Sequence, residues 1–119
     1  MENHVLQDGA PASSSPVVRV SLANFDPARF TEVNQMAEDI GEYLIPAIKK
    51  LPGLIHYYAA CSPKGSMIHV SIWDTDEHAQ QMSHLKEMIV DAKNDAEKVG
   101  VVFTPIVHYP TNWKIIIPQ

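Results

Sequence analysis

Residues 67–73, with the sequence MIHVSIW, decide the fold together with the DTDE that follows at residues 74–77. The first stretch alternates between two kinds of side chain, and a period of two is typical of a strand with two different faces. We expect Ile68, Val70 and Ile72 to pack against a hydrophobic layer. The opposite face is rich in aromatic and imidazole groups and is therefore predicted to line a cavity: Met67, His69, Ser71 and Trp73. The acidic residues that follow predict the start of a helix.

The chain has 119 residues, which is the length of one domain. We expect residues 1–16 to form a flexible N-terminal arm or a processing leader, because they are small, polar and proline-containing, and residues 17–119 to form a single folded domain. The arm has no basic segment followed by an apolar one, so it is not predicted to be a secretory signal. No apolar run approaches the roughly twenty residues that span a bilayer, so no membrane partner is expected.

The charge pattern argues against a nucleic-acid partner. The net charge is −5, the arginines are Arg19 and Arg29, and the lysines are scattered rather than gathered in a stripe. The single cysteine, Cys61, excludes an intramolecular disulfide and fits a reducing compartment, so a cytoplasmic location is expected.

The remaining patterns predict two helices and three more strands. A strand over residues 17–23 precedes a helix over 27–44, which should break or kink near Leu44 because Pro46 removes a backbone donor, with a short helical turn at 47–50. A strand over 54–62 and the turn at 63–66 lead into the opening strand as a hairpin. One helix should then run from residue 74 to Gly100.

A last strand is predicted over residues 101–109, and Pro105 inside it argues for an edge position or a bulge. A short extended run follows at 113–117. The order strand, helix, strand, strand, helix, strand predicts an α+β, ferredoxin-like β-α-β-β-α-β domain with an antiparallel sheet.

Such a sheet carries helices on one face only. We expect the other face to carry a set of polar, aromatic and apolar side chains: Arg19, Ser21, His56, Tyr58, Met67, His69, Ser71, Trp73, Thr104, Ile106 and His108. This face is too apolar to be left in water, so two copies packed sheet against sheet would cover it and enclose a cavity. The prediction is a homodimer forming a dimeric α/β barrel, in which residues 113–117 could add to the partner's sheet edge.

Several residues on this face have two interpretations each. Arg19 is its only predicted cation, so its natural partner is an anionic ligand or a carboxylate across the interface. His69 is a general base or a histidine satisfied at the interface. Tyr58 orients a substrate or packs in the interface. Trp73 forms a pocket wall or closes the strand end with its indole N–H bonded to backbone.

His56, His69 and His108 share one predicted face, and histidines gathered in this way can form a metal site. No tight His-x-His spacing or acidic partner supports such a site, so no metal is expected.

Three segments resemble the dimeric α+β barrel superfamily, and within it the antibiotic-biosynthesis-monooxygenase-like domains. They are the LPGLI entry into a strand at residues 51–55, the strand that ends in Trp73 before an acidic helix start, and the pair His84-Leu85. The resemblance covers about residues 17–109. It implies a homodimer with a pocket in each subunit, between the sheet and the helices.

The resemblance also implies two kinds of activity. Members include cofactor-independent monooxygenases that act on activated phenolic or polyketide substrates, and others are similar to haem-degrading enzymes. Trp73 matches a tryptophan that both kinds use, and His84 has the spacing of the haem ligand. The haem-degrading kind also uses an asparagine on the first strand, where this chain has Arg19, Ser21 and Ala23, and Asn24 falls at the end of that strand or beyond it. The phenol-oxidising kind uses an asparagine shortly before the tryptophan, where this chain has His69 and Ser71.

The first hypothesis is therefore a cofactor-independent monooxygenase-like protein that oxidises a small activated aromatic or enolisable substrate. His69 or His84 would take the proton and Trp73 would form the wall. The residues expected to bind the substrate are Tyr58, Ser71, Arg19 and His108. The alternatives are a non-catalytic dimeric small-molecule-binding protein and a haem-binding or haem-degrading protein.

Overall fold

The computed structural model describes residues 16–118, apart from the side chains of residues 86–90. The arm predicted for residues 1–16 lies outside this range except for Pro16. The elements follow in this order: β1 (Val17–Asn24), the 3₁₀ turn η2 (Pro27–Arg29), α2 (Phe30–Ile48), β2 (Leu54–Ser62), β3 (Ser66–Trp73), α3 (Asp76–Ala79), the 3₁₀ segment η3 (Gln80–His84), α4 (Lys86–Lys98), β4 (Val102–Phe103) and β5 (Val107–Pro110). None of the described helices is long and apolar enough to cross a membrane.

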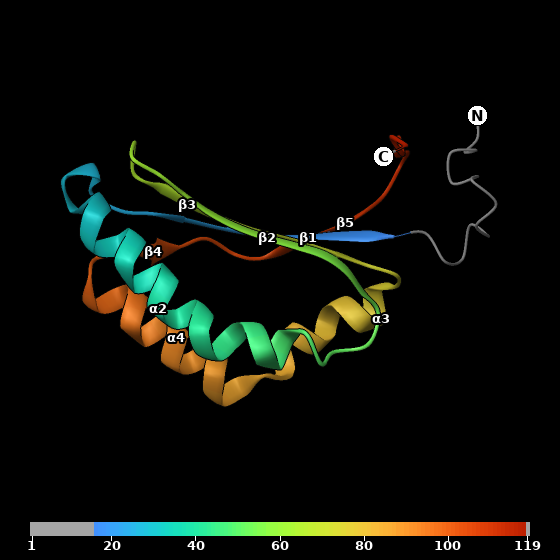
Figure 1. Cartoon of the computed structure of the whole chain (residues 1–119), viewed down its shortest axis with the longest axis horizontal. Helices are drawn as coiled ribbons and strands as arrows, with labels where there is room; N and C mark the ends of the chain where they lie inside the picture. Colours follow the sequence, from blue (N-terminus) through green and yellow to red (C-terminus); the bar gives the residue numbers. More distant parts are fainter. Residues whose placement is uncertain (1–15, 119) are drawn as a thin grey trace.

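The strands form one antiparallel sheet in the order β2-β3-β1-β4, and β5 also pairs with β1. Figure 1 shows the helices gathered on one side of this sheet. The predicted α+β, ferredoxin-like fold is therefore confirmed. The strand expected over 101–109 is divided into β4 and β5 on the outer side of β1, because Pro105 between them has no N–H to donate to a ladder.

The predicted break of the first helix near Leu44 is wrong. Helix α2 continues through Pro46 to Ile48. A proline in a helix interior costs about 3 kcal/mol or more, but Pro46 lies in the last turn and its side chain is exposed. Ile48 is buried in the same core cluster as Trp73, so tertiary packing holds the last turn in helical form.

The single helix predicted from residue 74 to Gly100 is also wrong. Its start is as expected, since Thr75 Oγ1 accepts the backbone N–H of His78 at 3.1 Å. The chain then leaves helical geometry at Leu85, where ψ is 58°. Helix α3 packs against β1 and β3, whereas α4 packs against α2. The turn at Leu85 lets each half contact its own partner.

The predicted orientation of β1 and β3 in the sheet is inverted. Met67, Ser71 and Trp73 are buried on the helix side, whereas Ile68 is exposed on the other. Their partners on β1 follow, with Val17 opposite Trp73 and Arg19 opposite Ser71. Alternation separates the two faces of a strand but does not say which one meets the helices, and here both faces are rich in apolar side chains.

We call the helix-free side of the sheet the open face (Figure 1). The register places on it a mainly aliphatic and aromatic set: Val18, Val20, Leu22, His56, Tyr58, Ala60, Ile68, Val70, Ile72, Val107 and Tyr109. For β2 the sequence prediction was right, because His56 and Tyr58 lie on this face and Tyr57 lies on the helix side. The open face is thus an apolar surface, as predicted, but with different residues from β1 and β3.

Candidate functional site

A row of polar side chains crosses the helix side of the sheet. Ser71 in the middle strand, β3, lies opposite Arg19 of β1 and opposite Tyr57 of β2, and Arg19 in turn lies opposite His108 of β5. His69 is two residues before Ser71 on the same face. Four strands thus bring their polar groups together in the layer between sheet and helices, which is elsewhere apolar.

Tyr57 and His69 form a hydrogen-bonded pair within this row. The Tyr57 hydroxyl is 2.9 Å from His69 Nδ1, and the two rings meet edge to face. Burial lowers the pKa of His69, and the nearby positive charge of Arg19 lowers it further. Burial raises the pKa of Tyr57, while Arg19 opposes that rise. Both side chains are therefore neutral near pH 7, and the imidazole is held in one orientation by the phenol.

Ser71 and Trp73 form the second pair. The Trp73 indole is fully buried, and its Nε1–H donates to Ser71 Oγ at 2.9 Å. The indole therefore bonds to a side chain two residues earlier in the strand rather than to backbone. It packs in a core cluster with residues of α2, α3 and η3, including Ile48, Ala79 and Met82. Trp73 thus closes the end of the polar row with an apolar wall.

Arg19 carries the fixed charge of the site. Only 6% of the residue is exposed, and its Nε–H is buried without a hydrogen-bond partner. No ion pair joins its guanidinium to a carboxylate of the described residues. Burial lowers the pKa of Arg19 and the neighbouring Tyr57 opposes this, but a guanidinium keeps its proton in proteins. A buried, unpaired cation is a costly arrangement that a folded chain rarely keeps without a use for it.

His108 ends the row at the β5 edge. Its Nδ1 lies 2.9 Å from Asp76 Oδ1, at the start of α3. The hydrogen bonds that Asp76 receives from His108 and Gln80 hold the pKa of this carboxyl below its usual range. The contact ties the last strand to the helical layer, and it leaves Asp76 engaged with its own partners rather than with Arg19.

Two of the residues predicted from the sequence lie outside the row. Tyr58 is 60% exposed on the open face, stacked on His56. His84 is exposed at the end of η3, and its imidazole makes no hydrogen bond with the described residues. The structure thus brings together Arg19, His69, Ser71, Trp73 and His108.

Sequence reasoning missed Tyr57. Its alternation on β2 was predicted correctly, but the inverted assignment of β3 placed His69 on the opposite face of the sheet. The usable signal was the hairpin itself, because pairing β2 with β3 across the turn at residues 63–65 places Tyr57 next to Ser71 and one step from His69.

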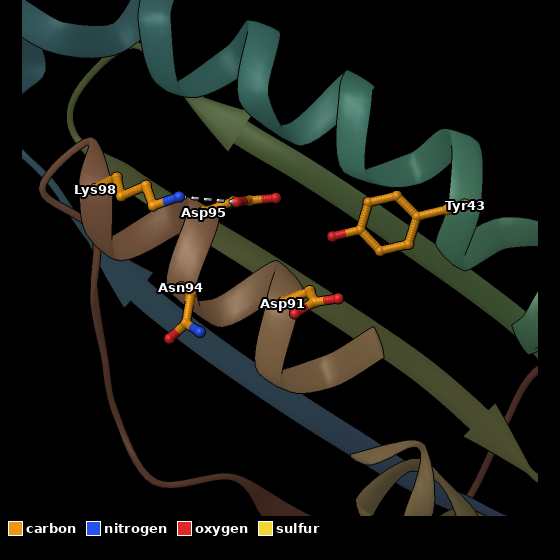
Figure 2. Close-up of a pocket in the computed structure, with 5 residues that line it drawn as sticks. All are labelled: Tyr43, Asp91, Asn94, Asp95 and Lys98. Atoms are coloured by element: carbon orange, nitrogen blue, oxygen red, sulfur yellow. Dashed lines mark ion pairs between the residues drawn. The ribbon is translucent and has the colours of Figure 1, made fainter. Parts of the chain in front are cut away.

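A separate pocket of about 370 Å³ lies on the helical layer, between α2 and α4 (Figure 2). Tyr43 points from α2 toward the carboxylates of Asp91 and Asp95. Asp95 is itself paired with Lys98, with 3.8 Å between Asp95 Oδ1 and Lys98 Nζ. Burial and these two carboxylates raise the pKa of the Tyr43 phenol. None of the sequence-predicted site residues lines this pocket, and none of its described lining residues has a buried polar atom without a partner, so we assign the candidate site to the polar row.

No grouping of three or more His, Cys, Asp or Glu side chains that could hold a metal ion occurs within residues 16–118 outside the undescribed side chains. The polar row offers the hydrogen-bonded Tyr57–His69 pair and one cation, Arg19, instead. That set can bind and orient an organic molecule with an oxygen acceptor, and it can accept a proton at an imidazole.

Comparison with solved structures shows that the fold is similar to that of proteins named as antibiotic biosynthesis monooxygenases. A monooxygenase of Streptomyces coelicolor, solved with the ligand nanaomycin D, superposes with a TM-score of 0.61 at 14% identity, over 89% of this chain and 95% of that one. A candidate antibiotic biosynthesis monooxygenase of Deinococcus radiodurans gives 0.62 at 16% identity, over 87% and 99%. The resemblance predicted from the sequence is thus confirmed at the level of the fold.

The same fold also occurs in proteins without a stated activity. A conserved protein of Methanosarcina mazei superposes with a TM-score of 0.59 at 13% identity, over 83% of this chain and 95% of that one. No family model matches the sequence, and no curated protein matches it. At these identities the likeness defines the architecture, and the chemistry has to be argued from the residues of this chain.

Proposed function

We propose that this chain is a cofactor-independent monooxygenase-like protein that oxidises a small activated aromatic or enolisable molecule in the polar row. The observation that carries the proposal is the part-buried Tyr57–His69 pair beside Arg19. It supplies a base, a group that orients the base, and a positive charge for an oxyanion, which is the set of roles that proton abstraction next to a carbonyl requires.

In the proposed reaction neutral His69 carries its proton on Nδ1, and this N–H donates a hydrogen bond to the Tyr57 oxygen. The unprotonated Nε2 then accepts the proton from the substrate. Arg19 stabilises the resulting enolate or phenolate oxygen. Trp73 is the wall against which an aromatic ring lies. The substrate then supplies the electrons to oxygen: a CH₂ group and O₂ become C=O and H₂O, so no separate reductant is consumed.

Anthrone is a suitable probe, because its CH₂ group is acidified by the carbonyl across the ring. We expect oxygen uptake with the wild-type protein, and a loss of about 10²-fold to 10⁴-fold in kcat/KM for His69→Gln, which is the usual contribution of a positioned base. A larger loss in His84→Gln than in His69→Gln would transfer the role of base to His84. If anthrone is not oxidised and neither variant changes oxygen uptake, the enzyme proposal fails.

The second candidate is a non-catalytic small-molecule-binding protein that uses the same row. It is favoured by the lowered pKa of His69, because a weakly basic imidazole is a poor proton acceptor. Retained binding of an aromatic ligand without oxygen uptake would support it. A third alternative, a haem-binding function, would use His84 to bind the haem in the site, whereas its side chain is exposed at the end of η3. A haem titration without a Soret shift would exclude this function.

We further propose that the protein is a homodimer in which the open faces of two copies meet. The open face is apolar and none of the described helices covers it (Figure 1), and a surface of this kind is characteristic of an interface. The segment after β5 adds to this surface, because Trp113, Ile115 and Ile116 are all more than half exposed. In such a dimer each polar row lies on the side of its sheet away from the interface.

A further inference from the structure

We propose that the molecule bound by the polar row enters as an organic monoanion whose oxygen accepts the Nε–H of Arg19. This inference rests on the proposed function for the position of the site but not for the reaction. The inference requires the ligand to be negatively charged before it binds. The proposed oxidation alone does not require this, because a neutral ketone could bind first and then lose its proton in the site.

The first step is the unsatisfied donor. The Arg19 residue is 94% buried, as its 6% exposure gives, and its Nε–H makes no hydrogen bond. Buried polar groups in folded proteins nearly always have a partner, and an exception marks a place where a ligand or water belongs. A guanidinium that uses Nε together with one terminal nitrogen presents two parallel donors, which match the two oxygens of a carboxylate or of a chelated enolate.

The second step is the missing counter-charge. The titratable side chains of the sheet that face Arg19 are Tyr57, His69 and His108, and none of them is a carboxylate. Asp76 is the carboxylate that reaches this edge of the sheet, and it is bonded to His108 and Gln80. One fixed positive charge with neutral donors around it is complementary to a single negative charge.

The third step removes the alternative partner. The sequence left open whether Arg19 meets an anionic ligand or a carboxylate across a dimer interface. Arg19 lies on the helix side of β1, because it is buried and is the register partner of the buried Ser71. The proposed interface is the opposite side of the same sheet. A second copy docked on the open face does not approach its guanidinium, so the ligand is left to supply the charge.

The test compares two probes that differ in charge but hardly in shape: 1-hydroxy-2-naphthoate and its neutral carboxamide. Isothermal titration of the whole protein under anaerobic conditions keeps binding separate from turnover. We expect the naphthoate to bind at least tenfold more tightly than the carboxamide. Arg19→Gln should abolish this preference, and Arg19→Lys should reduce it because a single ammonium cannot form the paired contact.

Arg29→Gln is the matched control, because Arg29 is exposed and paired with Glu32 at 2.8 Å, outside the site. It should keep the wild-type preference. A second measurement needs no variant: the Nε–H proton resonance of Arg19 should move downfield on addition of the naphthoate but not of the carboxamide. Equal binding of the two probes, binding of neither, or a preference that persists in Arg19→Gln would overturn the inference.

The same samples separate this inference from the proposed reaction. Preferential binding of the naphthoate together with no oxygen uptake on anthrone leaves the anion site standing and removes the monooxygenase. Oxygen uptake without any preference between the two probes does the reverse.

Discussion

The Tyr57 hydroxyl and His69 Nδ1 lie 2.9 Å apart across two paired strands, in a part of the sheet covered by helices. Each side chain is neutral because of its burial, and each is the hydrogen-bond partner of the other. The pair gives the site an imidazole of fixed orientation without a carboxylate to hold it. A carboxylate would raise the basicity of the ring, so this choice keeps His69 uncharged next to Arg19.

Tyr57→Phe tests the pair. The variant keeps the ring and removes the hydroxyl, so the part-buried His69 Nδ1 loses its partner, at a cost of about 1–3 kcal/mol in the free energy of unfolding. Urea denaturation measures this loss. Tyr58→Phe makes the same chemical change one residue away on the exposed face, and it should leave the midpoint within error of the wild type. Equal effects of the two variants would show that the hydrogen bond contributes nothing.

The lowered pKa of His69 predicts an acid-sensitive fold. Because the folded protein binds a proton at His69 less readily than the unfolded chain does, the stability from this residue is fully present above about pH 6.5, its ordinary pKa. It is lost as the pH falls through the lower folded-state value. The free energy of unfolding should therefore decrease more between pH 7.5 and pH 5 in the wild type than in His69→Gln.

Urea titrations at those two pH values measure this difference. His84→Gln is the control, since its imidazole is exposed, and it should show the wild-type dependence on pH. A His69→Gln protein that loses as much stability on acidification as the wild type would remove His69 as the cause.

The Trp73–Ser71 hydrogen bond predicts coupling between two positions. Ser71→Ala leaves the buried indole N–H unsatisfied, and Trp73→Phe leaves the buried hydroxyl of Ser71 unsatisfied, each at a cost of about 1–3 kcal/mol. Trp73→Phe also removes buried ring volume. The double variant loses both partners together, so its destabilisation should be smaller than the sum of the two, by about 0.5–3 kcal/mol. Additive effects in denaturant unfolding would contradict a contribution from this bond.

The sequence predicted the order of elements well because local signals determine it. Asp26 and Thr75 cap their helices through their own side chains, and Gly65 allows the positive φ of the hairpin turn. The two helix errors, at Pro46 and Leu85, arise where packing against a distant segment outweighs a local preference. Ile48 packs into the Trp73 cluster past the proline, and α4 turns at Leu85 to meet α2.

The site could be predicted only in part for a related reason. Trp73, Ser71, His69 and Arg19 were identified because strand alternation groups them, and the structure keeps them as one group. Alternation does not say which of the two faces meets the helices, however, and the sequence prediction placed this group on the wrong side of the sheet, away from them. With both faces of β3 rich in apolar residues, the side that meets the helices is decided by the whole set of strand pairings, and Tyr57 joins the site only when β2 and β3 are aligned.

The open face predicts a dimer that one charge should disrupt. Ile68 lies on this face, 37% exposed, in the strand β3 between Ala60 of β2 and Leu22 of β1. Ile68→Lys would place an ammonium in the apolar contact between two copies, where burying an unpaired charge is strongly unfavourable. Light scattering at micromolar concentration should give twice the chain mass of 13.3 kDa for the wild type and the single-chain mass for the variant.

Ile45→Lys is the matched control for this prediction, because Ile45 is an exposed isoleucine on α2, on the opposite side of the molecule from the open face. It introduces the same charge and should leave the dimer intact. A wild-type protein that is monomeric at these concentrations would contradict the proposed interface. An Ile68→Lys protein that remains a dimer would instead move the interface to another surface, and the segment carrying Trp113 and Ile115 would then be the next place to introduce a charge.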